Sequence, residues 1–410
     1  QLLDYRIDAT CRSSPSSSSS SSLCLPSPFH SDFGSMPSMV VASRALPSER
    51  RDPDAMSPRA LYWASQATMC VSIAIFFYEC FAYNNIFLKT ILPAVGKENM
   101  VPVFRVLFNS VWIMGLWSYH QAHWTDPGAV PERWLDFVTV VGESLPISPS
   151  RPEWQPGKAT LCKKCQAARP ERSHHCMLCG VCVLRMDHHC PWINNCVGFH
   201  NHKYFLLLGI YAWLASLIGL GTSLPELWRF VGIVLRIPNA GGFEGMPLEV
   251  SALDIWAFLT FGLFAFLIAL LLTSLLSTHL PLAMSNMTTI EDFYENMPNP
   301  YEQGGRVSNL AQVFGRPGLD WFLPVRPCRP ISDGISYPKM EQLDGHFQSL
   351  TLVDGVALLE DQGPAMLHQE NADCERTWRI RYRVRSPEEM KAMGENGNWH
   401  FWACGNGGRE

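Results

Sequence analysis

The sequence lacks an excess of positive charge. Its 410 residues carry a formal net charge of −5, whereas domains dedicated to nucleic acids present a basic stripe. The composition argues against a nucleic-acid binder, and no nucleic-acid partner is expected. The N-terminal region also lacks a short apolar run behind a basic start, so no secretory signal peptide is predicted. Because the first residue is Gln1, the natural start of the chain need not be part of this sequence.

Long stretches of the chain lack Asp, Glu, Lys and Arg altogether. Four such segments cover residues 60–78, 106–125, 204–224 and 255–278. A helix needs about 20 apolar residues to cross a hydrocarbon core of about 30 Å, and the core helices of soluble proteins rarely stay uncharged over such lengths. The sequence therefore predicts an α-helical integral membrane protein with four transmembrane helices.

Cysteine, in contrast, is abundant and concentrated. Seven of the 14 cysteines lie between Cys162 and Cys196, and four histidines lie among them. Two of the cysteine pairs have CxxC spacing, and a structural zinc ion takes four ligands, usually Cys3His or Cys2His2, from pairs spaced in this way. Cysteines at metal spacing, in place of a scattered disulfide framework, indicate a reducing compartment. They predict a zinc-binding domain between the second and third membrane helices.

The number of cysteines leaves one thiol unused. Two Cys3His sites need six cysteines and two histidines, and the segment offers seven cysteines. A spare thiol beside a histidine and a carboxylate is a candidate nucleophile. Cys190 is that candidate, because Asp187 and His188 precede it in the run Asp187-His188-His189-Cys190.

The complete spacing, C-x2-C-x9-HC-x2-C-x2-C-x4-DHHC-x5-C, resembles that of the DHHC protein S-acyltransferases, the palmitoyltransferase family. The resemblance implies two closed, structural zinc sites that interleave along the chain. The first is held by Cys162, Cys165, His175 and Cys182, and the second by Cys176, Cys179, His189 and Cys196. It also implies an enzyme that moves a long-chain acyl group from acyl-CoA to cysteines of cytosolic or membrane proteins close to the bilayer.

The implied reaction has two steps: the first forms an acyl-enzyme thioester and the second consumes it. Cys190 attacks the acyl-CoA, and a substrate cysteine then attacks the acyl-enzyme. A free cysteine has a pKa near 8.5, so His188 is expected to act as its base and Asp187 to orient His188. We expect a sharp backbone turn to bring these neighbours together. The alternatives are that His188 is a metal ligand while His189 acts as the base, or that Cys190 itself binds zinc.

The acyl chain is expected inside the helical bundle, because exposing it to water costs about 0.8 kcal/mol per CH2 group. The resemblance places the family's chain-length-gauging position near Ala215 in the third span, and a small residue there implies tolerance of sixteen- and eighteen-carbon chains. Small residues on this span equally serve close helix packing. Basic residues near the site are expected to contact the phosphates of CoA; the alternative is that they are simply solvated at the surface. They are Lys163, Lys164, Arg169, Arg172 and His174. The last three match family positions near CoA. Trp192 is expected to contact the acyl chain near its thioester, with plain packing as the alternative.

Three further motifs match the family and also have ordinary structural interpretations. Asp126-Pro127-Gly128 after the second span is a common helix stop. The TTxE motif, Thr288-Thr289-Ile290-Glu291, has the spacing of a capping box for a helix through Tyr294. Tyr301 is expected to pack inward and Asn309 to form a hydrogen bond near the last span, with a helix capped by Asn309 and Gly315 as the alternative.

Basic residues also predict the orientation. Lys and Arg are concentrated between the second and third spans, which places this segment and both termini in the cytosol. An endomembrane, the endoplasmic reticulum or the Golgi, is the expected location. The expected division is a disordered tail (1–58), helices one and two (60–125), the zinc domain (126–203), helices three and four (204–279), the TTxE and C-terminal element (280–316) and a divergent cytosolic tail (317–410).

Within the tail, the apolar segments 347–359 and 378–384 predict short strands. A competing interpretation of the whole chain is a membrane-anchored zinc scaffold without enzymatic activity. An intact DHHC run argues against it, because a scaffold needs no spare thiol.

Overall fold

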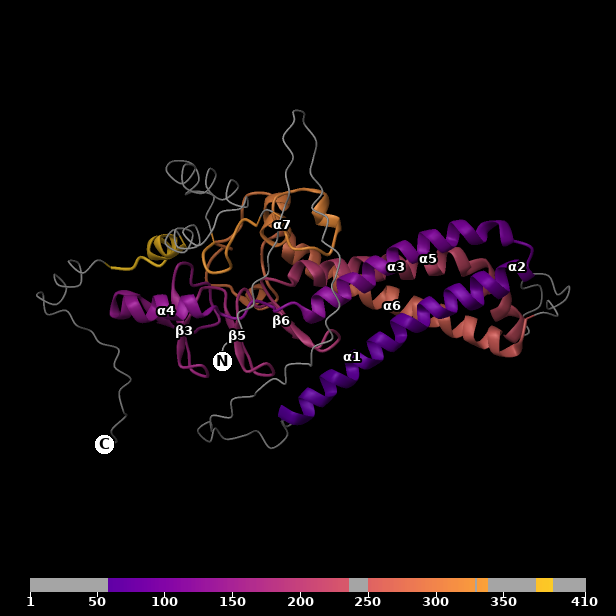
Figure 1. Cartoon of the computed structure of the whole chain (residues 1–410), viewed down its shortest axis with the longest axis horizontal. Coiled ribbons are helices and arrows are strands. Elements are labelled where there is room, and N and C mark those ends of the chain that lie inside the picture. The colour runs from indigo at the N-terminus through magenta and orange to yellow at the C-terminus, as the bar shows by residue number, and fades with distance from the viewer. Residues whose placement is uncertain (1–57, 236–249, 329, 338–373, 386–410) are drawn as a thin grey trace, which may run out of the picture.

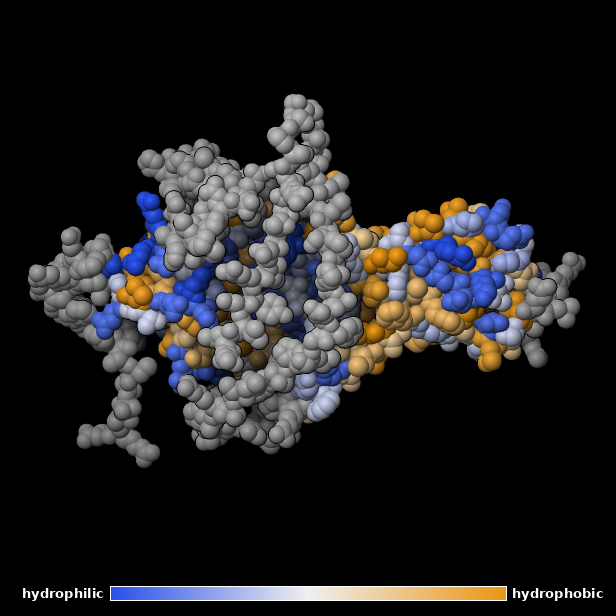
Figure 2. Space-filling model, viewed as in Figure 1, coloured by the Kyte–Doolittle hydropathy of each residue, from blue (hydrophilic) through white to orange (hydrophobic). Residues whose placement is uncertain are grey.

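The structure, a computed structural model, describes residues 58–235, 250–328, 330–337 and 374–385. The molecule is elongated: four long helices form one end, and short strands with small helices form the other (Figure 1). The surface of the helical end is largely apolar in the view shown, with polar residues toward its tip (Figure 2). The segment 347–359, for which strands were predicted, lies outside the described residues.

Four helical segments are long and apolar enough to span a membrane: Ala60–Ala94, Glu98–Trp124, His202–Leu235 and Ala252–Met284. They confirm the four predicted membrane helices. Each is longer than the uncharged run that predicted it, because the helices continue into their polar ends. The helical elements are α1 (Pro58–Phe81), η1 (Ala82–Ile91), α2 (Leu92–Ala94), η2 (Glu98–Met100), α3 (Val101–Trp124), α5 (His202–Leu235) and α6 (Ala252–Met284).

Aromatic packing holds the end of the bundle that lies away from the strands. The first span continues from α1 into the π-helical stretch η1, where Tyr83 and Phe87 are fully buried. Tyr83 stacks on Phe108 of α3 with ring centroids 4.0 Å apart, and Phe87 stacks on Phe258 of α6. A Cβ atom added at Gly219 of α5 would lie only 3.1 Å from the ring of Phe261. The absence of a side chain at Gly219 therefore lets α5 and α6 pack closely there.

The zinc domain consists of three antiparallel hairpins in chain order, β2–β3, β4–β5 and β6–β7. The strands are β1 (Ile147–Pro149), β2 (Ala159–Cys162), β3 (Ala167–Arg169), β4 (His174–Cys176), β5 (Val181–Val183), β6 (His188–Cys190) and β7 (Asn195–Val197), and β1 pairs in parallel with β2. Helix α4 (Glu132–Val141) and the 3-10 turn η3 (Gly142–Ser144) precede them. After β7 the chain enters α5.

The Asp126-Pro127-Gly128 motif connects α3 to the hairpins. The Asp126 Oδ1 atom accepts hydrogen bonds from the backbone N–H groups of Gly128 and Ala129, 2.6 and 2.7 Å away. Gly128 has φ 108°, a value that favours glycine. The Gly128 carbonyl then accepts from Leu184 N, so the motif both stops the helix and attaches it to the second hairpin.

The chain after α6 returns to the zinc domain through η4 (Glu291–Phe293), α7 (Arg306–Phe314) and η5 (Leu319–Phe322). Thr288 and Glu291 exchange the two hydrogen bonds of a capping box, but only the short turn η4 follows, and the predicted helix through Tyr294 is wrong. Asn309 as a helix cap is also wrong, because α7 already begins at Arg306 behind Gly305. The Asn309 amide instead donates to the Met284 carbonyl at the end of α6.

Residues 374–385 form a helix over 374–381 followed by a turn, so the strand predicted for 378–384 is wrong. A short apolar run does not distinguish a buried helix from a strand. Trp378 and Tyr382, one helical turn apart, are fully buried against Trp134 of α4. Arg381 binds the buried carboxylate of Glu171 through two nitrogens, at 2.6 and 2.8 Å. This part of the tail therefore packs on the zinc domain.

Candidate active site

The three hairpins repeat one local design. Cys162, Cys176 and Cys190 each end the first strand of a hairpin, and they follow one another at equal spacing along the chain. A residue with positive φ lies four positions later in each turn: Gln166, Gly180 and Asn194. The sequence analysis missed this repeat, although the equal spacing is visible in the sequence.

Each metal cluster is assembled from two successive hairpins. The turn of the first hairpin supplies Cys162 and Cys165, and the strands of the second supply the cross-strand pair His175 and Cys182. The turn of the second hairpin supplies Cys176 and Cys179, and the strands of the third supply the pair His189 and Cys196. Neither cluster can therefore form from a single hairpin.

The distances in both clusters fit a tetrahedral zinc ion. A Zn–S bond of about 2.3 Å and a Zn–N bond of about 2.0 Å imply S···S edges of about 3.8 Å and S···N edges of about 3.5 Å. In the first cluster Cys165 Sγ lies 3.6 Å from Cys182 Sγ and 3.2 Å from His175 Nδ1. In the second, Cys179 Sγ lies 3.5 Å from Cys196 Sγ and 3.4 Å from His189 Nδ1. Four ligands in each cluster leave no open position.

Cys190 is absent from both clusters. It occupies the position of the first turn cysteine in the third hairpin, but Ile193 stands where the other two hairpins have Cys165 and Cys179. The third hairpin is followed by α5, so no further cross-strand pair faces this turn. Cys190 is buried in an apolar cluster that includes Ala122 of α3 and Phe205 of α5.

The third turn is attached to the membrane helices. The Trp192 carbonyl accepts hydrogen bonds from the hydroxyls of Ser72 and Tyr119, on the first and second spans. The Asn195 amide donates to three carbonyls at the end of α3, those of Ala122, His123 and Thr125. These contacts hold Cys190 at the end of the helical bundle.

Strand alternation separates the functions of the two adjacent histidines. Successive side chains of a strand point to opposite faces, so on β6 His188 and Cys190 share one face while His189 points to the metal cluster. The predicted sharp turn is therefore wrong, because the two-residue period of an extended strand already places His188 on the same face as Cys190.

Asp187 is almost fully buried and held from both sides. Its Oδ2 atom accepts from His188 Nδ1 at 2.5 Å, and its Oδ1 atom accepts from the backbone N–H of Thr289 at 2.8 Å. The Thr289 hydroxyl also donates to the Asp187 carbonyl. The TTxE segment after the last span thus fixes the first residue of the DHHC run.

These contacts determine the charge states. Burial opposes ionisation of Asp187, but the hydrogen bond from His188 and the nearby His202 hold the pKa of Asp187 well below its ordinary value. Burial likewise disfavours the imidazolium of His188, but the interactions with Asp187 and Cys190 outweigh it and raise the pKa of His188 to about 9. The arrangement therefore favours a proton on His188 when a negative charge lies next to it.

Comparison with known proteins agrees with this geometry. The family model described as DHHC palmitoyltransferase matches residues 155–296. The chain is 33% identical over 244 residues to probable protein S-acyltransferase 12 of Arabidopsis thaliana. The matched region covers 58% of this chain and 80% of that relative. It is 31% identical over 289 residues to palmitoyltransferase ZDHHC20 of Mus musculus, and this match covers 64% of this chain and 74% of the relative. It is 32% identical over 313 residues to palmitoyltransferase ZDHHC15A of Danio rerio, and this match covers 70% of this chain and 88% of the relative.

The chain belongs to the DHHC palmitoyltransferase family.

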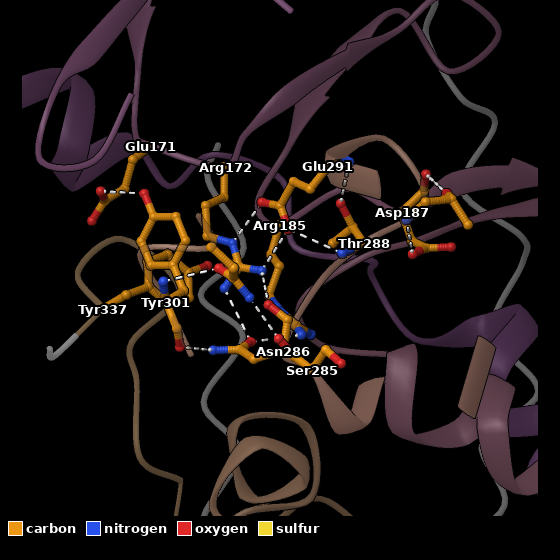
Figure 3. A network of polar contacts seen from close by, with 12 residues as sticks. Glu171, Arg172, Arg185, Asp187, Ser285, Asn286, Thr288, Glu291, Tyr301 and Tyr337 are labelled. Atoms are coloured by element: carbon orange, nitrogen blue, oxygen red, sulfur yellow. Dashed lines mark hydrogen bonds and ion pairs between the residues drawn. The ribbon is translucent and has the colours of Figure 1, made fainter. Parts of the chain in front are cut away.

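In this DHHC protein a buried polar network braces the active site (Figure 3). The Arg172 guanidinium forms two hydrogen bonds with Glu291, at 2.7 and 2.6 Å, and also binds Asn286. The ring of Tyr301 lies 4.5 Å from its charged carbon, and that of Tyr337 lies 4.9 Å away. The network joins the hairpins to the chain segment behind α6.

Arg185 extends this network toward the active site. It donates to the same Asn286 side-chain oxygen and interacts with His202 Nδ1, 3.2 Å away. Sequence reasoning missed Arg185, Asn286 and Tyr337, because none of them stands in a recognisable spacing. Arg172, expected at CoA, has its guanidinium buried and bound to Glu291 and Asn286.

The other residues expected near CoA differ in exposure: Arg169 is as buried as Arg172, whereas Lys163 is exposed. Arg169 binds the hydroxyls of Thr160 and Ser150, at 3.0 and 2.6 Å. It lines a small cavity with His174 and Lys158. Burial and the neighbouring Arg169 lower the pKa of His174 to about 4, so its ring is neutral at ordinary pH. The Trp192 side chain is 47% exposed beside the helix ends.

Proposed function

We propose that palmitoyl transfer in this DHHC protein runs through Cys190 as the nucleophile, with His188 as the general base and Asp187 orienting it. One observation carries the proposal: Cys190 is outside both metal clusters and shares a strand face with His188, whose ring is bound to Asp187. A thiol in this setting can pass its proton to the imidazole, and the carboxylate stabilises the resulting imidazolium.

The first step forms the acyl-enzyme. The Cys190 sulfur attacks the thioester carbonyl of palmitoyl-CoA or a similar donor, and its proton passes to His188. The carbon–sulfur bond to CoA breaks, and the CoA sulfur leaves with a proton from His188. In the second step a substrate cysteine gives its proton to His188 and attacks the acyl-enzyme, and Cys190 leaves as the thiol. Atoms and electrons balance without an oxidant or reductant.

Two zinc ions are proposed for the two clusters, one for each. They supply no chemistry to the transfer; when bound, they hold successive hairpins together. The ligands would be the eight cysteines and histidines of the two clusters. The second set contains His189 and Cys196, which lie on both sides of Cys190 in the sequence, so it fixes the β6–β7 hairpin that carries the nucleophile.

The acyl chain is proposed to enter the helical bundle beside Cys190. The cysteine is surrounded by apolar residues of α3 and α5, including Ala122 and Phe205, which suits a donor whose chain stays in an apolar environment. Ala215, farther along α5, is buried in the second apolar cluster of the bundle. Its small side chain supports long-chain donors, and a strict preference for short acyl-CoA would contradict this part of the proposal.

CoA is proposed to lie on the side of Arg169 and His174, with Lys163 and Lys164 nearby and Trp192 close to the thioester. Arg172 is proposed to act as a brace for this surface, because its guanidinium is already bound to Glu291. The hairpins and both termini are proposed to face the cytosol, in the endoplasmic reticulum or the Golgi. Substrates would be proteins with cysteines near the membrane surface, which Cys190 can reach at the end of the bundle. The boundaries proposed for the described residues are 60–125, 126–203, 204–279 and 280–316, whereas the predicted tail over residues 1–58 lies almost wholly outside the described residues.

The test is transfer by purified protein in detergent or vesicles. Incubation with an alkyne-labelled palmitoyl-CoA is expected to label the chain with a hydroxylamine-sensitive thioester. Cys190→Ser is expected to remove the label, whereas Cys70→Ser, a cysteine of the first span, is expected to leave it unchanged. Label that persists in Cys190→Ser would contradict the proposal.

A further inference from the structure

A histidine from the last membrane helix lies at the active site. His279 of α6 packs its ring against Phe205, with centroids 5.1 Å apart, and against His188, with centroids 5.3 Å apart. Phe205 also contacts His188 at 5.2 Å, so the three rings pack on one another. The His279 side chain is 13% exposed. Apart from Asp254 in its first turn, α6 has no Asp, Glu, Lys or Arg, so a titratable ring at this place needs a reason.

His279 points at the carboxylate that binds His188. Its Nδ1 atom lies 3.6 Å from Asp187 Oδ2, the oxygen that already accepts from His188 Nδ1 at 2.5 Å. The other oxygen of Asp187 is bound by Thr289 N. Within the described residues His279 Nδ1 is buried and makes no hydrogen bond. Leaving such a group unpaired costs about 1–3 kcal/mol, and Asp187 Oδ2 is an acceptor 3.6 Å away from it.

The spacing favours a hydrogen-bonded set over a third metal site. Asp187, His188 and His279 bring three ligand atoms within 4.8 Å of one another. Two ligands at about 2.0 Å from a tetrahedral metal are separated by about 3.3 Å. The 2.5 Å between Asp187 Oδ2 and His188 Nδ1 is too short for that and is the length of a charge-assisted hydrogen bond.

We propose that His279 is a positioning residue for acyl transfer: it donates from Nδ1 to Asp187 Oδ2 and packs against the His188 ring. The proposal rests on the proposed roles of Cys190, His188 and Asp187. The Asp187 carboxylate is then held by Thr289 on one oxygen and shared by two imidazoles on the other. His188 keeps its Nδ1–H on Asp187, and its Nε2 atom stays directed at the Cys190 thiol. The last span thereby contributes directly to the geometry of the DHHC run.

Three variants test this role in the full-length protein in detergent. His279→Ala removes the donor and the ring. His279→Asn keeps a donor close to the Nδ1 position. Thr278→Ala, at an exposed neighbour on the same helix, is the matched control. The measurements are the rate of Cys190 acylation over a range of palmitoyl-CoA concentrations, the zinc content and the melting temperature.

His279→Ala is expected to lower the saturating rate of acylation roughly ten- to a hundred-fold, with the half-saturating palmitoyl-CoA concentration and the zinc content unchanged. His279→Asn is expected to recover most of the rate, and Thr278→Ala to match the parent. Parental rates in His279→Ala, or equal losses in the Ala and Asn variants, would overturn the proposal. If His279→Ala does not fold, the rate of His279→Asn against the parent decides. Failure of Cys190→Ser to abolish acylation would instead contradict the proposed function itself.

Discussion

Arg172 and Glu291, 119 residues apart in the sequence, form a fully buried ion pair with a closest separation of 2.6 Å. Arg172 follows the first hairpin, and Glu291 ends the TTxE motif behind the last span. The same Glu291 carboxylate accepts from Thr288 N, and the next residue of the motif, Thr289, binds Asp187. The pair therefore links the hairpins that carry the metal clusters to the segment that binds Asp187.

Glu291→Gln is expected to destabilise the zinc domain by about 3–5 kcal/mol, because it leaves the buried Arg172 cation without its counter-charge. The measurement is the melting temperature in detergent, followed together with acylation. Glu295→Gln, at an exposed position in the same segment, is the control. Equal melting temperatures for the two variants would show that the pair does not brace the domain.

Zinc binding is expected to respond unequally to the loss of single ligands. The second hairpin supplies ligands to both clusters, whereas the first supplies only Cys162 and Cys165, to one cluster. Cys176→Ser is therefore expected to reduce the zinc content to less than one ion per chain, and Cys162→Ser to leave about one. The metal content of purified variants checks this. Identical losses in the two variants would contradict the chained arrangement of hairpins.

Thr289→Val is expected to slow acylation by a few fold. The change keeps the shape and the backbone N–H that binds Asp187 Oδ1, but it removes the hydroxyl hydrogen bond to the Asp187 carbonyl, worth about 1 kcal/mol. Zinc content is expected to stay at the parental value. The initial rate of acylation is the measurement, with Thr139→Val on α4 as the exposed control. A parental rate in Thr289→Val would mean that the hydroxyl is dispensable.

Trp378→Ala is expected to weaken the packing of residues 374–385 on the zinc domain by about 3–5 kcal/mol. Its ring is fully buried against Trp134 and Phe137, and its Nε1 atom donates to Asp333 at 2.8 Å. Faster proteolysis within 374–385, at unchanged zinc content, is the expected result. Glu375→Ala, at an exposed position of the same helix, serves as the comparison. Equal cleavage rates in parent and Trp378→Ala would contradict this packing.

The parts of the site that the sequence predicted are those set by local spacing. The ligands of each metal cluster come from turns and cross-strand pairs, so their order in the chain reflects their geometry. The number of cysteines in the segment predicted that one thiol is not a metal ligand. The equal spacing of Cys162, Cys176 and Cys190 also explains why: the third turn has Ile193 in place of its second cysteine. The four spans followed from the absence of charge over lengths that only a membrane helix tolerates.

The parts that the sequence did not predict depend on contacts between distant segments. No local pattern indicates that Asn286 binds Arg172 and Arg185, or that His279 faces Asp187. The run 378–384 is apolar enough for a strand, but its burial comes from Trp378 and Tyr382, which share one face of a helix. The capping alternative for Asn309 failed because the helix begins three residues earlier, at Arg306, and the Asn309 side chain instead binds Met284 and Gln303.

The most direct test is mass spectrometry of the purified chain after reaction with palmitoyl-CoA, combined with its zinc content. We expect a hydroxylamine-labile acyl group on Cys190 in a protein that keeps two zinc ions per chain, and Cys190→Ser that loses the acyl group but neither ion. An acyl group on another cysteine would contradict Cys190 as the nucleophile, and the loss of a zinc ion in Cys190→Ser would show that this thiol is a metal ligand.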